Sequence, residues 1–248
     1  MSLTLKLEGE VRDVVAAFAV SCADVGGDVT VKGADGCEAS LACIDIAGDL
    51  DVAYGSASCG NVDGDVTVKG ADGRDTNLAC SNIAGNLDVA DANVSCGSID
   101  GDVTVKGAQE RETSLSCDDI GGDLMLRAAV VSAGTLHGDV AMQGGDPTKG
   151  ALLTCDDIDG DLTVSSAQVV CDAVRGDVCV SGEPGTSKDV GVIADDIDGD
   201  VVLTGGQVVA DRVRGCVTVN ASAPATLTVS EIDGDIVARG GVVNVVKQ

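Results

Sequence analysis

The chain has 248 residues and carries 41 Asp and Glu against 15 Lys and Arg, a formal net charge of −26. This charge points away from nucleic acids and anionic membrane surfaces, because both are bound by clustered Lys and Arg. With no Trp, one Tyr and one Phe, the chain also lacks aromatic platforms for stacking bases. It contains no apolar stretch of about 18 residues, so we expect no membrane insertion.

Residues 1–19 are expected to form an N-terminal cap or a degenerate first coil. Within them, residues 10–18 fit either a short capping helix or a coil that begins at Gly9. The 18 residues between Gly9 and Gly27 slightly favour the coil, as do the positions of Val20 and Cys22. Any helix in the protein is expected to be confined to residues 10–18.

From residue 20 to residue 248 the chain is expected to be one β-solenoid. A glycine returns twelve times, and in ten cases it is followed by Asp. The twelve are Gly27, Gly48, Gly64, Gly85, Gly101, Gly122, Gly138, Gly160, Gly176, Gly199, Gly215 and Gly234. Their gaps alternate between 16 residues and 19 to 23 residues. Self-similarity of this kind predicts an all-β, single-domain, right-handed parallel β-helix of about 12 to 13 coils, alternately short (16) and long (about 21).

One coil shows why strands are expected. After Gly160, apolar residues stand at Leu162, Val164, Ala167, Val169, Cys171 and Val174. Spacing by two is the alternation of a strand with one buried face, and each step of three marks a corner. The strands should begin just after each repeat glycine. A core this thin is expected to leave no internal cavity for a substrate.

The long coils differ from the short ones by an insertion at one corner, as at residues 69–77. The equivalent segments are 32–40, 106–114, 143–151, 181–190 and 220–226. These polar loops should therefore form a row along one edge, and variable loops commonly carry binding sites. We take Asp72, Arg74, Glu110 and Arg111 as candidate partner contacts.

Eight of the eleven cysteines occupy one repeat position, five residues before a repeat glycine. This cysteine ladder consists of Cys22, Cys43, Cys59, Cys80, Cys96, Cys117, Cys155 and Cys171, and other coils fill the same position with Ala133, Ala194, Ala210 and Val229. The exchange with Ala and Val indicates a small buried slot that holds free thiols. Disulfides or a metal are the alternative, although neighbouring Cβ atoms about 4.8 Å apart exceed the roughly 3.8 Å that a disulfide prefers.

Unpaired thiols and the lack of a signal peptide favour a cytoplasmic location. A surface-exposed or secreted location follows instead if a signal segment has been removed from the N-terminus.

The aspartates at the corners have two interpretations. In the structural one, Gly supplies an unusual backbone angle and Asp hydrogen-bonds the local backbone. In the other, stacked carboxylates bind divalent cations such as calcium, with Asp159, Asp161, Asp198 and Asp200 as the weak candidates. No other cofactor is expected. The single histidine, His137, is expected to be a surface corner residue.

The last strand is apolar and is followed by no polar cap. Val242, Val243, Val245 and Val246 lie within the final eight residues. An open rung exposes unpaired backbone groups and core side chains, so self-association is expected there, as a homodimer or a filament.

The repeated motif is represented by Ile99-Asp100-Gly101-Asp102-Val103-Thr104-Val105. It resembles the adhesin-type β-solenoid repeat domains of bacteria and, as a second choice, the polymerising β-helices called bactofilins. The adhesin-type resemblance implies a non-catalytic surface or scaffold role.

We therefore expect a non-catalytic structural or interaction protein whose partner is another protein or a second copy. The alternatives are a divalent-cation-binding solenoid and a β-helix hydrolase or lyase that uses surface carboxylates. A groove lined by converging acidic and basic side chains would favour the enzyme.

Overall fold

The computed structural model describes residues 4–6, 14–16, 18–33, 39–70, 75–107, 112–144, 150–182, 190–221 and 224–246. All the strand pairs among them are parallel, none of these residues is helical, and the strands stack as a β-solenoid of about 11 turns. The predicted fold class is confirmed, with slightly fewer turns than the 12 to 13 expected. None of the described segments is a helix that could span a bilayer.

The chain divides into two compact units, Met1–Gly122 and Asp123–Gln248. We call them unit 1 and unit 2 and describe each separately. Each unit has two stacks of strands, sheet A and sheet B, that alternate along the chain.

In unit 1, sheet A consists of β1 (Thr4–Lys6), β3 (Ala19–Ser21), β5 (Ala39–Ala42), β7 (Gly55–Ser58), β10 (Asn77–Ala79), β13 (Asn93–Ser95) and β15 (Ser114–Ser116). Sheet B consists of β2 (Val14–Ala16), β4 (Val29–Lys32), β6 (Leu50–Ala53), β9 (Val66–Lys69), β12 (Leu87–Ala90) and β14 (Val103–Lys106). Two short strands, β8 (Asn61–Val62) and β11 (Asn82–Ile83), pair at the corner before the repeat glycine.

In unit 2, sheet A consists of β17 (Val130–Ser132), β19 (Ala151–Thr154), β22 (Ala167–Val170), β25 (Gly191–Ile197), β27 (Gly206–Val213), β29 (Ala225–Ile232) and β31 (Val242–Val245). Sheet B consists of β16 (Leu124–Arg127), β18 (Val140–Gln143), β21 (Leu162–Ser165), β24 (Val178–Ser181), β26 (Val201–Leu203), β28 (Val217–Val219) and β30 (Ile236–Ala238). The corner strands here are β20 (Asp157–Ile158) and β23 (Ala173–Val174).

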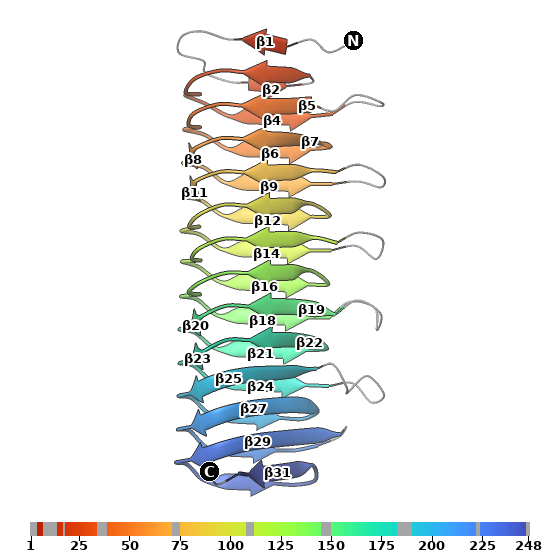
Figure 1. Ribbon diagram of the computed structural model, residues 1–248, viewed down its shortest axis with the longest axis vertical. Coiled ribbons are helices and arrows are strands. Elements are labelled where there is room, and N and C mark those ends of the chain that lie inside the picture. Colours follow the sequence, from red (N-terminus) through yellow and green to blue (C-terminus); the bar gives the residue numbers. More distant parts are fainter. Residues whose placement is uncertain are drawn as a thin grey trace. The chain divides into compact units, whose positions relative to one another are not determined.

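Within each unit the strands stack turn upon turn (Figure 1), and paired strands lie in register. Leu87 stands opposite Val66 on one side and Val103 on the other, and all three are buried. Because alternate residues point to opposite faces, each turn sends the same apolar positions inward. Every sheet B strand after β2 begins two residues beyond a repeat glycine, as predicted.

The segment 10–18 contains a strand at its described residues. Val14–Ala16 form β2, and Val14 stands opposite Val29. This result supports the first-coil interpretation over a capping helix. A coil that began at Gly9 would place Val11 opposite Val29, however, so the register differs by three residues from the one expected.

The short coils turn from sheet B to sheet A through one residue with positive φ. These residues are Tyr54 (58°), Asp91 (53°), Ala128 (49°) and Ser166 (53°). A single residue in the left-handed conformation lets the chain turn within very few residues. This conformation is unfavourable for residues other than Gly, Asn and Asp. In the long coils the inserted loop takes this place.

Candidate functional site

The Asp that follows each repeat glycine connects consecutive turns of the solenoid. In unit 1, Asp28 Oδ1 accepts a hydrogen bond from the backbone N–H of Asp49 at 3.0 Å, and Asp49 Oδ1 accepts one from Asp65 at 2.9 Å. In unit 2, Asp139 Oδ1 accepts the N–H of Asp161 at 2.8 Å. The structural interpretation is therefore correct in kind but wrong about the partner, which is the backbone of the next turn and not the local backbone.

The repeat glycines are required for close approach and not for an unusual backbone angle. Among the described glycines only Gly206, Gly240 and Gly241 have positive φ, and none of them is a repeat glycine. A Cβ added to Gly64 would lie 2.6 Å from the carbonyl carbon of Gly48, one turn earlier. The expectation that the repeat glycine supplies an unusual angle is therefore wrong.

The four candidate cation ligands are already occupied by protein partners. Asp161 Oδ1 and Asp200 Oδ1 accept backbone N–H groups of the next turn, at 2.8 Å from Asp177 and 2.7 Å from Cys216. Asp159 forms an ion pair with Arg175 and a hydrogen bond with His137, and Asp198 forms an ion pair with Arg214. Among the described residues, no three carboxylate, thiol or imidazole groups are placed to hold one metal ion.

Those ion pairs form alternating columns at the corners of unit 2. His137 Nδ1 lies 2.7 Å from Asp159 Oδ2, and Arg175 contacts both Asp159 and Asp157, the latter at 3.0 Å. Further along, Arg212 reaches Glu231 at 3.2 Å. These groups are all partly exposed, and each pair links one turn to the next. The columns therefore connect turns at the surface and do not form an acid–base pair within a groove.

The equivalent corner of unit 1 carries amides and a groove. Asn82 Nδ2 donates a hydrogen bond to Asn61 Oδ1 at 3.0 Å, and the N–H of Ser98 donates to Asn82 Oδ1 at 3.0 Å. An open groove of about 490 Å³ lies along the same corner, at the turns that contain Asp24 and Asp45. It is lined by Ala23, Asp24, Val25, Gly26, Asp45, Ile46, Ala47 and Asp63.

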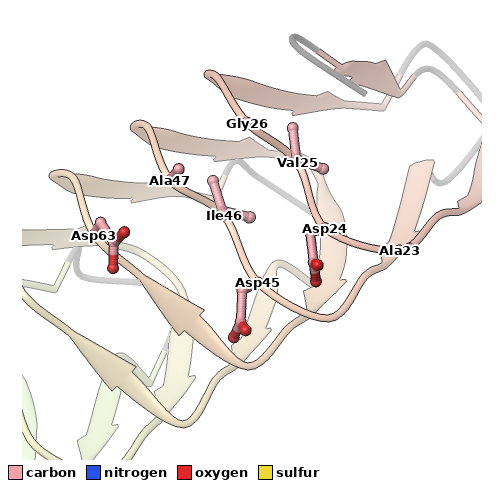
Figure 2. A pocket seen from close by; sticks show the side chains of 8 residues that line it. All are labelled: Ala23, Asp24, Val25, Gly26, Asp45, Ile46, Ala47 and Asp63. Atoms are coloured by element: carbon pink, nitrogen blue, oxygen red, sulfur yellow. The ribbon is translucent and has the colours of Figure 1, made fainter. Parts of the chain in front are cut away.

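Figure 2 shows the carboxylates of Asp24 and Asp45 projecting in the same direction from consecutive turns, with Asp63 apart from them. The residues that line this groove include acidic side chains and no basic one. This groove therefore lacks the combined acidic and basic lining that would favour a hydrolase or lyase.

The cysteine ladder stacks in register in unit 1. The N–H of Cys43 donates to the carbonyl of Ser58 at 3.1 Å, and that of Cys59 donates to Ala79 at 3.0 Å, so each Cys lies beside the Cys of the next turn. The thiols of Cys22, Cys43, Cys59, Cys80 and Cys96 are half-buried, whereas those of Cys117, Cys155 and Cys171 are buried. The prediction of a fully buried slot is therefore wrong for the first five rungs.

Neighbouring thiols affect one another. A hydrogen bond with Cys59, together with burial, raises the pKa of Cys43, and a hydrogen bond with Cys117 raises that of Cys96. Hydrogen bonds from Cys59 and Cys96 lower the pKa of Cys80. In a row of interacting thiols, the first proton is lost by the thiol whose thiolate form is best stabilised by hydrogen bonds from its neighbours. These two hydrogen bonds therefore favour loss of the proton from Cys80 before the other thiols of the row.

The outward face of sheet A in unit 2 carries no charged side chain in its two columns, and we call it the uncharged face. The first column is Val130, Leu152, Gln168, Gly191, Gln207 and Thr226, and the second is Ser132, Thr154, Val170, Ile193, Val209 and Thr228. Ile193 is 53% exposed and Val170 is 40% exposed. Gly191 stands between Gln168 and Gln207 and leaves a shallow hollow of about 140 Å³ beside Ile193.

From β5 to β15 the corresponding columns of unit 1 are also uncharged, but their residues are small or polar. They contain Ser40, Ser56, Asn77, Asn93 and Ser114 in one column, and Ala42, Ser58, Ala79, Ser95 and Ser116 in the other. The signal for both faces was present in the sequence, because every second residue of each predicted sheet A strand falls in these columns. These outward positions carry no motif of their own, so the inward repeat pattern does not single them out.

Two sets of predicted contact residues have different outcomes. Asp72, Arg74, Glu110 and Arg111 lie outside the described residues. Val242, Val245 and Val246 are exposed on or just after β31, and Val243 is partly exposed. The structure thus presents these valines to solvent, as the sequence led us to expect.

Comparison with protein-family models, with curated proteins and with solved structures found no match.

Proposed function

We propose that this protein is a non-catalytic interaction module that self-associates through the uncharged face of unit 2. The observation that carries the proposal is the exposure of apolar side chains such as Val170 and Ile193 in two uncharged columns of a chain whose net charge is −26. Monomeric proteins rarely leave a contiguous apolar patch in water, and such patches commonly mark contact sites. Ile193, Val170 and Val209 form the apolar centre of this one.

Electrostatics favours a second copy as the occupant. A basic partner would be attracted to the acidic corners, such as the column Asp156, Asp172, Asp195 and Asp211 that borders the uncharged face, and not to the face itself. Two copies that meet face to face keep their carboxylates at the rim, where water and salt screen them. Two sheets pack at about 10 Å with interdigitated side chains. The hollow at Gly191 can receive an apolar side chain of the other copy.

The alternative of a hydrolase or lyase has weaker support. The only histidine, His137, is held by Asp159, and the arginines of the same corner are paired with carboxylates of neighbouring turns. The described groove in unit 1 is acidic and contributes no basic partner. A structural role for these groups accounts for every one of these contacts.

The exposed last strands are the competing contact surface. In β30 and β31, Ile236, Val237, Val242 and Val245 are exposed. Contact there would extend the stack of turns, head to tail into a filament or end to end into a dimer, whereas contact through the uncharged face is isologous and closes as a dimer. Side-face contact suits an adhesin-type scaffold, and head-to-tail stacking suits a bactofilin-like polymer.

Sedimentation velocity over a range of salt concentrations tests the proposal. We expect a dimer that becomes stronger as salt rises, because screening reduces the repulsion between two acidic chains. Ile193→Asp should give a monomer. Val202→Asp is the matched control, since it places the same charge at an exposed valine of sheet B in the same unit.

Three results would count against this assignment. A monomer at all salt concentrations overturns self-association. A dimer that survives Ile193→Asp but is lost in Val242→Asp/Val245→Asp moves the contact to the last strands. A dimer that weakens with salt indicates that ion pairs, and not the uncharged face, hold it together.

A further inference from the structure

The cysteine ladder of unit 1 has a regularity that packing alone does not require. Six consecutive turns place Cys in this slot, Cys22, Cys43, Cys59, Cys80, Cys96 and Cys117. Unit 2 fills the same slot with Ala133, Ala194 and Ala210 on other turns, so Ala satisfies the packing. A run of thiols without interruption therefore points to a property that Ala lacks.

Most of these cysteine residues are partly exposed. The first five are half-buried, whereas Cys155 and Cys171 in unit 2 are only 4% exposed. The residue after the Cys is small in four of the six turns, at Ala23, Gly60, Ser81 and Gly97. In unit 2, Asp156 and Asp172 stand at that position. The ladder of unit 1 is thus open to a ligand along most of its length.

The spacing of the ladder selects one kind of ligand. Neighbouring rungs lie about 4.8 Å apart, which is too far for a disulfide without backbone movement because its Cβ atoms prefer about 3.8 Å. A metal–thiolate bond is about 2.3 Å long, so an ion bound linearly between two thiolates spans about 4.6 Å. This span is close to the spacing of the rungs, so two neighbouring thiolates can hold one ion with a small movement of their side chains. A straight row also supplies two donors to each ion and not the four that zinc prefers, in agreement with the lack of a three-ligand cluster among the described residues.

We propose that the thiols of Cys22 to Cys117 bind thiophilic monovalent cations of the copper(I) and silver(I) type, each ion held between two neighbouring rungs. Soft thiolates select such d¹⁰ ions, which accept linear two-coordination. Binding converts two thiols to thiolates, releases two protons to solvent and changes no oxidation state. The six thiols, taken in neighbouring pairs, hold about three ions.

The acidic surroundings favour the approach of a cation. Asp24 and Asp45 line the groove beside the first two rungs, and Ala23, which follows Cys22, lines it too. Asp45 also interacts with both Cys43 and Cys59. A field of this sign raises the local concentration of cations and speeds their association.

Two variants with equal numbers of ladder thiols test the proposal in the full chain. The background replaces the five cysteines outside the row with Ala, namely Cys37, Cys155, Cys171, Cys179 and Cys216. The alternating variant adds Cys43→Ala, Cys80→Ala and Cys117→Ala, and it leaves no two thiols on neighbouring turns. The block variant adds Cys22→Ala, Cys43→Ala and Cys59→Ala, and it leaves three neighbouring thiols. Circular dichroism melts confirm that both fold, as the Ala rungs of unit 2 lead us to expect.

The probe is silver(I) nitrate in chloride-free buffer, followed by calorimetry and by thiolate-to-metal absorption in the ultraviolet. We expect about three tight ions in the background and about one in the block variant, with binding at least about 100-fold weaker in the alternating variant because the second thiolate is lost. Equal binding by the two variants overturns the proposal, since thiol number would then suffice. Zinc binding as tight as silver overturns it as well, because it requires a cluster of donors that a straight row does not form.

Discussion

Units 1 and 2 share one backbone repeat but stabilise its corner by different chemistry. In unit 1 the corner carries the amides Asn61 and Asn82, joined side chain to side chain. In unit 2 the equivalent position carries Asp157, Asp196, Arg212 and Glu231, and Arg175 and Arg214, which directly precede a repeat glycine, each contact acids of the preceding turn. The carboxylate that follows the repeat glycine caps the next turn in both units. The repeat glycine and the hydrogen-bond acceptor after it are thus common to both units. The corner side chains, amides in unit 1 and charged groups in unit 2, are specific to each unit.

The same contrast holds for the two features that carry our proposals. The thiol row is continuous and open in unit 1, whereas unit 2 retains only the buried neighbours Cys155 and Cys171. The outward columns of sheet A hold only small or polar residues between β5 and β15 of unit 1, whereas in unit 2 they also contain larger apolar residues such as Leu152, Val170 and Ile193. The two units thus differ in side chains that do not determine the fold. We expect these side chains to carry the function.

The largest effect should come from the repeat glycines, and it should be the same in both units. Gly64→Ala in unit 1 and Gly176→Ala in unit 2 each force a Cβ against the backbone of the preceding turn. We expect each to lower the free energy of unfolding by about 2–3 kcal/mol in denaturant titrations. Gly150→Ala is the control, since nothing lies within 4 Å of its added Cβ. A loss in one unit only would contradict a shared structural role.

Alkaline pH should destabilise the protein through the thiol row of unit 1. Burial raises the pKa of Cys22, and hydrogen bonds with neighbouring thiols raise the pKa of Cys43 and Cys96, so the folded state keeps protons that the unfolded state loses. The resulting stability is complete below the unfolded pKa, near 9, and is lost as pH rises above it. Cys80, whose pKa is lowered, offsets part of this loss.

We expect a fall of about 1–2 kcal/mol in the free energy of unfolding between pH 8 and pH 10, discounted for the partial exposure of these thiols. Denaturant melts of the intact chain and of Cys22→Ala/Cys43→Ala/Cys96→Ala measure it. The variant shares every other titrating group, so its curve should be flatter. Identical slopes for the two proteins would show that the row does not act as a coupled set of acids.

The corner charges of unit 2 should matter less, and salt should distinguish them from the amides of unit 1. Arg175→Gln removes contacts to Asp157 and Asp159 that are partly exposed. We expect a loss of about 0.5–1 kcal/mol at low salt that disappears near 1 M. Asn82→Ala should lower the free energy of unfolding by about 1 kcal/mol at either salt concentration, because its hydrogen bonds are not screened in this way. A salt-independent loss in Arg175→Gln would mean that packing, and not charge, is what the arginine contributes.

The smallest effect should be that of calcium. Asp159 and Asp198 are paired with arginines, and Asp161 and Asp200 accept backbone N–H groups. Millimolar calcium should therefore shift the melting temperature no more than magnesium at equal ionic strength. A shift specific to calcium, lost in Asp159→Asn/Asp198→Asn, would restore the cation-binding alternative.

The fold followed from the sequence because one pattern is repeated without interruption. The strand starts at Val66 and Leu87 and the inward set of the coil after Gly160 depend only on spacing by two and on the glycine period, and all of them agree with the structure. The left-handed turns at Ala128 and Ser166 were not predictable in this way, because neither residue type favours positive φ. Closure of a short coil imposes that conformation on them.

The candidate sites were less accessible from the sequence. Ion pairs such as Arg175 with Asp159 join residues 16 positions apart, so they become visible only when the residues before each repeat glycine are read as a column. The exposure of Cys43 and Cys59 depends on what covers the slot from outside, which the inward alternation does not encode. The position of the thiol row was readable from the glycine period, whereas the uncharged face has no local motif.

The uncharged face is tested most directly by the distance between two copies. A spin label is placed at Ser132→Cys, on that face, in a chain whose other cysteines are replaced by Ala. Pulsed electron paramagnetic resonance then measures separations between labels of different chains at high salt. Because packed sheets lie about 10 Å apart, we predict a defined intermolecular distance within about 30 Å. A label at Cys179 on sheet B should give no such short distance. A short distance at Cys179 with none at residue 132 would contradict the proposed contact.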